Sequence, residues 1–202
     1  MRDNVGFPGR RKRRSNVRRR RGTAVLEFAI SLPLLFLTSI VPFVIGVYLD
    51  RFLTVKQTAR SSGHMYSRGV DFSKTGVQNK IRDAGANLQI SRTNSGGQGV
   101  VYVSTVVQAS SGVNMGRSVV SHRIRMGDSS IAGSTIAMPA STDNRGNVVN
   151  YENDGQAVAT LPAGLNVGAG QRLYVAEVFH EPRGIPMPEL FRINRLNSRV
   201  FF

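Results

Sequence analysis

The hydrophobic pattern begins with one long apolar segment. From Phe28 to Leu49 the chain has 22 consecutive residues without a formal charge. A helix of that length is about 33 Å long, which matches the roughly 30 Å hydrocarbon core of a bilayer. A buried core helix is the alternative, but such a helix usually has a polar stripe, and this segment has only three serine and threonine residues. The segment therefore predicts a transmembrane helix, in which Pro33 and Pro42 should introduce bends.

Beyond residue 50 the pattern predicts a small domain of the α+β class. Apolar residues recur at spacings of three and four from Phe52 to Tyr66, so the helix should continue outward to about residue 68. Residues 74–87 predict a second, short helix. One face of that helix carries three apolar residues, namely Val77, Ile81 and Ala84.

The rest of the chain alternates between apolar and polar residues over short segments, as strands do. We expect four or five strands of an antiparallel sheet packed against the long helix, at 88–92, 100–107, 119–126, 172–180 and 198–202. A glycine-rich connection predicts that the first two form a hairpin. Segment 100–107 is apolar on both faces, which indicates a central strand. Residues 127–170 are rich in Gly, Ser, Asn and Asp and predict an exposed excursion.

Alternation also predicts where the charged residues of two strands point. In segment 119–126, His122 and Ile124 should lie opposite Arg123 and Arg125. Glu177 could point outward as a simple edge charge, or inward as a partner for an arginine on an adjoining strand. The outward orientation is the favoured interpretation, because carboxylates are seldom buried.

Basic residues are concentrated before the apolar segment. The net charge of the chain is +15, and residues 1–22 hold ten Lys and Arg against one acid, Asp3. By the positive-inside rule, Arg18, Arg19, Arg20 and Arg21 are a topology signal that keeps this leader cytoplasmic and places the rest of the chain outside. The alternative is a nucleic-acid-binding arm or a nuclear-localisation tract, which is less favoured because a lipid-soluble segment follows directly. The apolar run is too long for a secretory signal and lacks an A-x-A end, so it predicts an anchor.

Glu27 is the acid directly before the apolar segment, and its position needs a physical reason. A carboxylate costs about 2.5 to 3.5 kcal/mol at mid-bilayer and less near the interface. If the chain were cut after Gly22, the new ammonium at Thr23 would lie one helical turn from Glu27. In a filament, the same ammonium could pair with Glu27 of a neighbouring subunit. Glycine before the cut would let a protease approach an extended backbone at the helix start.

These residues resemble a known processing site. The run Arg-Arg-Gly followed by Thr-Ala-Val-Leu-Glu-Phe is similar to the cleavage site of type IV prepilins, and more closely to that of the TadE-like pseudopilins of Flp (tight-adherence) pilus systems. The resemblance continues after the span in RFLTVKQTARSSGHMYSRGV, where the matching positions are Val55, Gln57, Ala59, Arg60, Gly63 and Arg68, whereas His64 and Met65 depart from the family pattern. The segments SHRIRMGDSSI, DNRGNVVNY and QRLYVAEVFHEPRGIP also resemble the outer part of some TadE-like proteins.

The resemblance implies a function and a set of partners. A prepilin peptidase would cleave between Gly22 and Thr23, which makes Glu27 the fifth mature residue and Phe28 the sixth; these two would act in assembly. The chain would then be a minor pilin in the bacterial inner membrane, with residues 1–22 removed, 23–68 as the helix and 69–202 as a periplasmic domain. Its partners would be other pilins, the assembly platform and the lipid bilayer, and not nucleic acid.

Enzyme and metal chemistry find little support in the sequence. The three histidines, His64, His122 and His180, lack ligand spacing, and with no cysteine there is no thiol or Cys-based zinc site. GDSS at 127–130 is not a G-x-S-x-G turn. DNRGNVVNYEND at 143–154 lacks the frame of a calcium loop, and GAGQRL lacks the third glycine of a dinucleotide turn. We expect no catalytic residue, cofactor or metal.

Two functions therefore remain as hypotheses. The first is a structural subunit that is trimmed at Gly22 and joins an extracytoplasmic filament through its N-terminal helix. The second is an uncleaved single-pass membrane protein whose outer domain binds a ligand or partner. The N-terminus of the membrane-resident protein distinguishes them.

Overall fold

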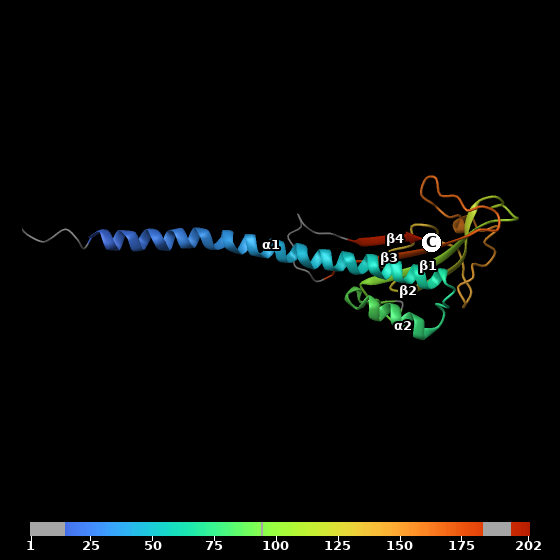
Figure 1. Cartoon of the computed structure of the whole chain (residues 1–202), viewed down its shortest axis with the longest axis horizontal. Helices are drawn as coiled ribbons and strands as arrows, with labels where there is room; N and C mark the ends of the chain where they lie inside the picture. Colours follow the sequence, from blue (N-terminus) through green and yellow to red (C-terminus); the bar gives the residue numbers. More distant parts are fainter. Residues whose placement is uncertain (1–14, 94, 184–194) are drawn as a thin grey trace, which may run out of the picture. The chain divides into compact units, whose positions relative to one another are not determined.

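The computed structural model describes residues 15–93, 95–183 and 195–202, with side chains from Thr23 onward. It has two compact units, Met1–Tyr48 and Leu49–Phe202. The first helix, α1 (Ser15–Ser67), runs through both units (Figure 1). Its end at Ser67 confirms that the helix continues to about residue 68, whereas its start lies eight residues before Thr23.

The N-terminal unit is an exposed apolar helix. α1 is the one helix of the described chain that is long and apolar enough to cross a membrane, and none of its most apolar stretch is buried. Large side chains such as Phe36, Leu37 and Phe43 are more than half exposed. An exposed stripe of this kind in water would be costly, so the helix is suited to a lipid environment.

The second unit, Leu49–Phe202, is a four-stranded antiparallel sheet with helices on one face, and it is called the outer unit below for its place at the end of α1 and not for a side of a membrane. Its strands are β1 (Gly99–Gln108), β2 (Ser118–Gly127), β3 (Arg172–His180) and β4 (Leu196–Phe201), in the order β2-β1-β3-β4. The short helix α2 (Thr75–Ala84) and the 3-10 turns η1 (Ala86–Leu88) and η2 (Gly155–Ala157) complete it. The α+β class and the central position of β1 are confirmed.

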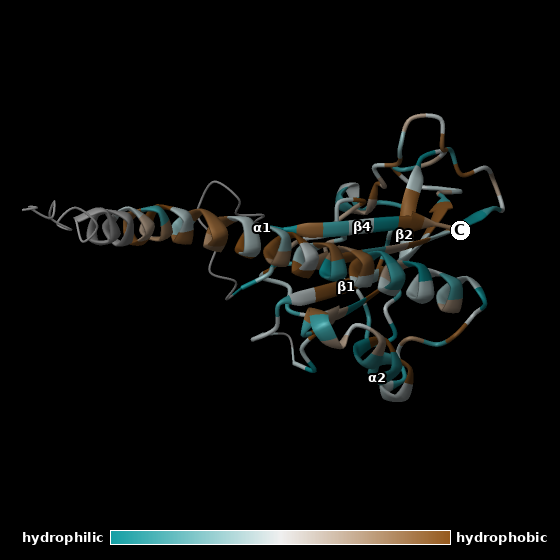
Figure 2. Ribbon diagram, turned by 60° about the vertical axis from the view of Figure 1, so that its left-hand side comes forward, coloured by the Kyte–Doolittle hydropathy of each residue, from teal (hydrophilic) through white to brown (hydrophobic). Residues whose placement is uncertain are grey.

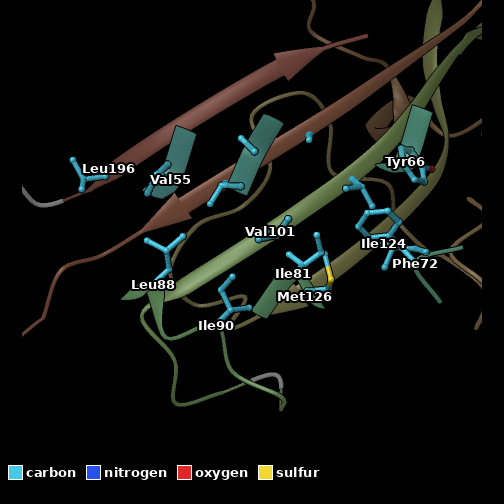
Figure 3. Close-up of a cluster of buried hydrophobic side chains, with 14 residues drawn as sticks. Val55, Tyr66, Phe72, Ile81, Leu88, Ile90, Val101, Ile124, Met126 and Leu196 are labelled. Carbon is cyan, nitrogen blue, oxygen red and sulfur yellow. The ribbon is translucent and has the colours of Figure 1, made fainter. Parts of the chain in front are cut away.

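One face of the sheet packs against α1 and α2. In Figure 2, hydrophobic and hydrophilic residues alternate along the part of α1 that lies over the sheet. The buried side chains come from every element of this layer (Figure 3): Val55, Ala59, Tyr66, Phe72, Ile81, Leu88, Ile90, Val101, Val103, Ile124, Met126, Ala176, Val178 and Leu196. His122 and Ile124 face this layer, and their pairing register places Arg123 and Arg125 on the other face, as predicted.

Gly63 brings α1 close to the strand that ends the described chain. A Cβ on Gly63 would overlap the ring of Phe202, at its atom Cε2. Phe202 is held there by a backbone hydrogen-bond pair with Tyr174 and by a ring contact of 4.5 Å with His64. A position that matches the family pattern in the sequence thus has a packing role.

Gly63→Val is therefore expected to lower the free energy of unfolding of the outer unit by about 1 to 3 kcal/mol, the usual cost of overpacking. Unfolding of the full chain in detergent, followed by circular dichroism, measures the change. The matched control is Gly76→Ala in α2, where nothing lies within 4 Å of the added Cβ. A Gly63→Val protein as stable as the control would contradict the close contact.

The expected strand at 88–92 is wrong. Residues 86–88 form a 3-10 turn, Gln89 has a left-handed backbone with φ of 48°, and Ile90 makes only an isolated parallel bridge to Gly99. Leu88 and Ile90 are nevertheless buried. Their alternation reflects burial from an irregular segment, which a period of two does not distinguish from a strand. The predicted hairpin with 100–107 is accordingly absent from the described residues.

Segment 127–170 was expected to be exposed, and that part of the prediction is wrong. This segment, called the covering segment below (residues 127–170), lies over the second face of the sheet. Several of its apolar side chains are buried against that face: Ile131, Ala132, Ile136, Ala137, Val148, Ala157 and Val167. Turn-forming residues predict irregular backbone correctly, but they say nothing of which side chains between the turns are buried.

This covering segment buries Glu177, so the outward orientation favoured from the sequence is wrong. Glu177 is 1% exposed on β3 and accepts hydrogen bonds from the hydroxyls of Ser134 and Thr135 and from the backbone amide of Thr135. Arg199 on β4 supplies the ion pair, with 3.4 Å between Nε and Oε1. The carboxylate therefore ties residues 134–135 and β4 to the sheet.

Glu177→Ala is expected to lower the free energy of unfolding by about 1 to 3 kcal/mol, because it removes the buried acceptor that Ser134, Thr135 and Arg199 share and leaves a void in its place. The matched control is Glu181→Ala, since its ion pair with Arg183 is solvent-exposed and should change stability by less than about 0.5 kcal/mol. Denaturant unfolding of both variants measures the difference. Equal stabilities would show that the buried carboxylate contributes little.

Candidate functional site

The processing motif predicted from the sequence lies within α1. The helix begins at Ser15, so the backbone from Arg18 to Thr23 is helical. The extended backbone expected at Gly22 is therefore not found. Arginine is a good helix former, and one glycine costs a helix only about 1 kcal/mol, so the helix continues through it. A peptidase acting between Gly22 and Thr23 would have to unwind this turn locally.

The assembly residues predicted from the sequence share one helical turn. Thr23 and Glu27 are four residues apart, which places them on one face, and the Glu27 side chain is exposed. Phe28, next to it, is 64% exposed. The structure thus places Glu27 and Phe28 on the surface of the N-terminal unit, where another helix could contact both.

The prolines do not interrupt α1, which is helical through Pro33 and Pro42. Two hydroxyls bond to the helix backbone: Ser31 donates to the Glu27 carbonyl at 2.7 Å, and Thr38 donates to the Leu35 carbonyl at 3.0 Å. A proline frees the carbonyl four residues earlier, at positions 29 and 38, and neither hydroxyl reaches those. The expected bends stay a prediction.

The histidines lie in three separate environments. His64 is exposed beside Phe202, and His122 bonds through Nδ1 to the Tyr66 hydroxyl and through Nε2 to the Arg145 carbonyl at 2.9 Å. His180 is fully buried. Its Nε2 lies 3.1 Å from Arg51 Nη1, and its Nδ1 lies 3.0 Å from the Gln98 carbonyl. Because Arg51 can only donate, Nε2 accepts and Nδ1–H donates, which defines a neutral ring. Burial, followed by the Arg51 charge, lowers the pKa of His180.

Two acidic segments that superficially resemble sites are turns. The Asp128 carboxylate accepts from the backbone amides of Ser130 and Gly96, each at 2.9 Å. Asp143 accepts from the amides of Arg145 and Asn147 at 2.8 and 2.7 Å. Hydrogen bonds lower the pKa of both carboxyls: the largest cause is the Ser130 backbone amide for Asp128, and for Asp143 it is the side-chain amide of Asn147, which donates to Oδ2 at 2.7 Å. Within the described part of the chain, no three His, Asp or Glu side chains gather to hold a metal ion.

Sequence reasoning missed a basic cavity on the second face of the sheet. Arg123 and Arg125 line it together with Tyr102, beneath residues of the covering segment. The alternation of β2 was the available signal, since it placed both arginines on one face. The alternation did not indicate that residues of segment 127–170 would cover this face and form a cavity with it.

Comparison of the chain with models of protein families, with characterised proteins and with solved structures finds no match. Its function must therefore be argued from its own residues.

Proposed function

We propose that this chain is a pilin-like assembly subunit of the TadE type, anchored in a membrane and trimmed at Gly22. The observation that carries the proposal is the order of three features along the single helix α1. One helix holds Thr23 and Glu27 a turn apart, continues as an exposed apolar stretch, and ends as the packing helix of the outer unit. A subunit built this way can insert by its helix and join neighbours through the same helix.

The Glu27 carboxylate gives this proposal its physical basis. In lipid, an exposed carboxylate is unfavourable unless a cation pairs with it. Cleavage after Gly22 would create such a cation at Thr23, four residues away. If Thr23 of one subunit pairs with Glu27 of the next, processing and assembly are coupled, because only trimmed subunits carry the ammonium.

Co-purification with filaments tests the function. The full chain, tagged in the outer unit and produced in a cell with a tight-adherence pilus system, should be found in sheared or detergent-extracted filaments with the other pilins. Recovery only as a membrane monomer, with an intact N-terminus, would favour the single-pass receptor hypothesis.

Orientation gives a separate prediction. Replacing Arg18 to Arg21 and Arg10 to Arg14 with neutral residues should scramble topology, because the excess of basic residues before the span then disappears. A reporter fused after Phe202 should become active on the cytoplasmic side in a large share of molecules. The control replaces Arg60, Arg68 and Arg92 beyond the span and should leave topology unchanged. Unchanged topology in the leader variant, together with salt-dependent DNA binding by the wild-type leader, would favour a nucleic-acid arm.

A further inference from the structure

The second face of the sheet contains a basic cavity of about 310 Å³. Its walls come from β1, β2 and the covering segment: Tyr102, Arg123, Arg125, Ser129, Met138, Pro139 and Thr142. Cavities that hold small ligands begin at about this size and combine apolar walls with a few polar groups. Two of these residues are cationic and none is acidic, so the cavity favours an anion.

Arg123 is the unusual residue of this cavity. It is 8% exposed, and its Nε and Nη2 have no hydrogen-bond partner among residues 15–93, 95–183 and 195–202. A buried guanidinium normally has its donors satisfied, since leaving them unmade costs free energy. Burial is the main cause that lowers the pKa of Arg123, and the charge of Glu177 only partly opposes it.

Glu177 does not neutralise Arg123. Its oxygens are taken by Ser134, Thr135 and Arg199, and no ion pair joins it to Arg123 in the described chain. Arg125 likewise has no ion pair with any described acid. The positive charge of the two arginines is therefore available to a group from outside.

The cavity is also fixed in shape. The Tyr102 ring lies under the Arg123 guanidinium, 5.1 Å from its centre, and the Tyr102 hydroxyl donates to the Ala132 carbonyl at 2.7 Å. The backbone amide of Arg123 is bonded to Gly146 of the covering segment. These bonds hold the Tyr102 ring and the backbone of Arg123 in place, which preorganises the floor of the cavity for binding.

We propose that this cavity binds a small carboxylate, whose charged group lies between Arg123 and Arg125 and whose body lies against Tyr102, Met138 and Pro139. Guanidinium groups match the planar, two-oxygen geometry of a carboxylate. We expect a carboxylate with an apolar body to bind more tightly than inorganic phosphate, because phosphate would leave the apolar walls of the cavity in contact with water. The same chemistry is offered by a free organic acid and by a glutamate side chain of a neighbouring protein.

Calorimetric titration of the full-length chain in a non-ionic detergent tests the proposal. The probes are benzoate, as a free acid, and N-acetylglutamate amide, as a side-chain mimic, with benzamide and inorganic phosphate as comparisons. Saturable binding of either carboxylate is expected, and the tighter of the two identifies the source. Phosphate should bind at least tenfold more weakly, and benzamide should not bind. No saturable carboxylate binding, or phosphate binding of equal strength, would overturn the proposal.

Variants connect the binding to the cavity. Arg125→Gln removes an exposed charge and should weaken carboxylate binding about tenfold or more without changing the fold. Arg123→Met keeps the stem of the side chain and should abolish binding, while the unfolding midpoint stays the same or rises because an unpaired buried charge is gone. Arg117→Gln, an exposed arginine outside this cavity, is the control. Unchanged binding in Arg125→Gln would overturn the site even if Arg123→Met fails to fold.

Discussion

Glu27→Gln is expected to yield a subunit that inserts and is processed but does not assemble. A neutral amide is easier to place in lipid than a carboxylate, so insertion should be at least as efficient. The variant loses the ion pair with the Thr23 ammonium, and removing one partner of a desolvated pair typically costs several kcal/mol. The fraction of subunits in filaments should fall tenfold or more, which corresponds to at least about 1.4 kcal/mol of association free energy.

The matched control for this result is Glu181→Gln, which makes the same change at a solvent-exposed ion pair of the outer unit. It should assemble as the wild type does. N-terminal processing and filament content are measured in the same cells for all three proteins. A Glu27→Gln subunit that is processed and still assembles normally would reduce Glu27 to a tolerated interfacial charge, and the filament proposal would lose its main physical support.

Gly22→Leu should block processing, because a bulky side chain would then precede the scissile bond. Gly22→Ala should have a smaller effect whose size follows from the helical backbone at this position. Alanine stabilises a helix over glycine by about 1 kcal/mol, so unwinding the turn becomes harder and cleavage should slow by about fivefold. The rate of conversion from precursor to mature chain measures both effects.

Gly46→Ala is the control for the glycine variants. Gly46 is also in α1, nothing lies within 4 Å of the added Cβ, and it is far along the chain from the cut. Its processing rate should equal that of the wild type. Cleavage of Gly22→Leu at the normal rate would exclude this bond as the processing site.

The sequence predicted well those elements whose hydrophobic period is unbroken. The apolar run predicted the long helix, the apolar segment 100–107 predicted β1 as a central strand, and the alternation in 119–126 predicted β2 with the correct faces. The helix begins eight residues before Thr23, because a cleavage motif is not a boundary of secondary structure. Arginines before Gly22 are good helix formers, so the backbone has no reason to leave the helix there.

The errors in the outer unit share one physical cause, which is burial by segments that are distant in the sequence. Leu88 and Ile90 are buried without being in a strand, and Glu177 is buried because residues 134–135 cover it. Local periodicity reports which face of an element is apolar, but not what covers it. For the same reason, the cavity at Arg123 could not be foreseen from the alternation of β2 alone.

The intact mass of the wild-type chain extracted from membranes tests the central claim most directly. Cells with an active prepilin peptidase should yield a protein that starts at Thr23, lighter than the full chain by residues 1–22, and cells without the peptidase should yield the full-length protein. A membrane-resident chain that still begins at Met1 or Arg2 in the presence of the active peptidase would contradict the account.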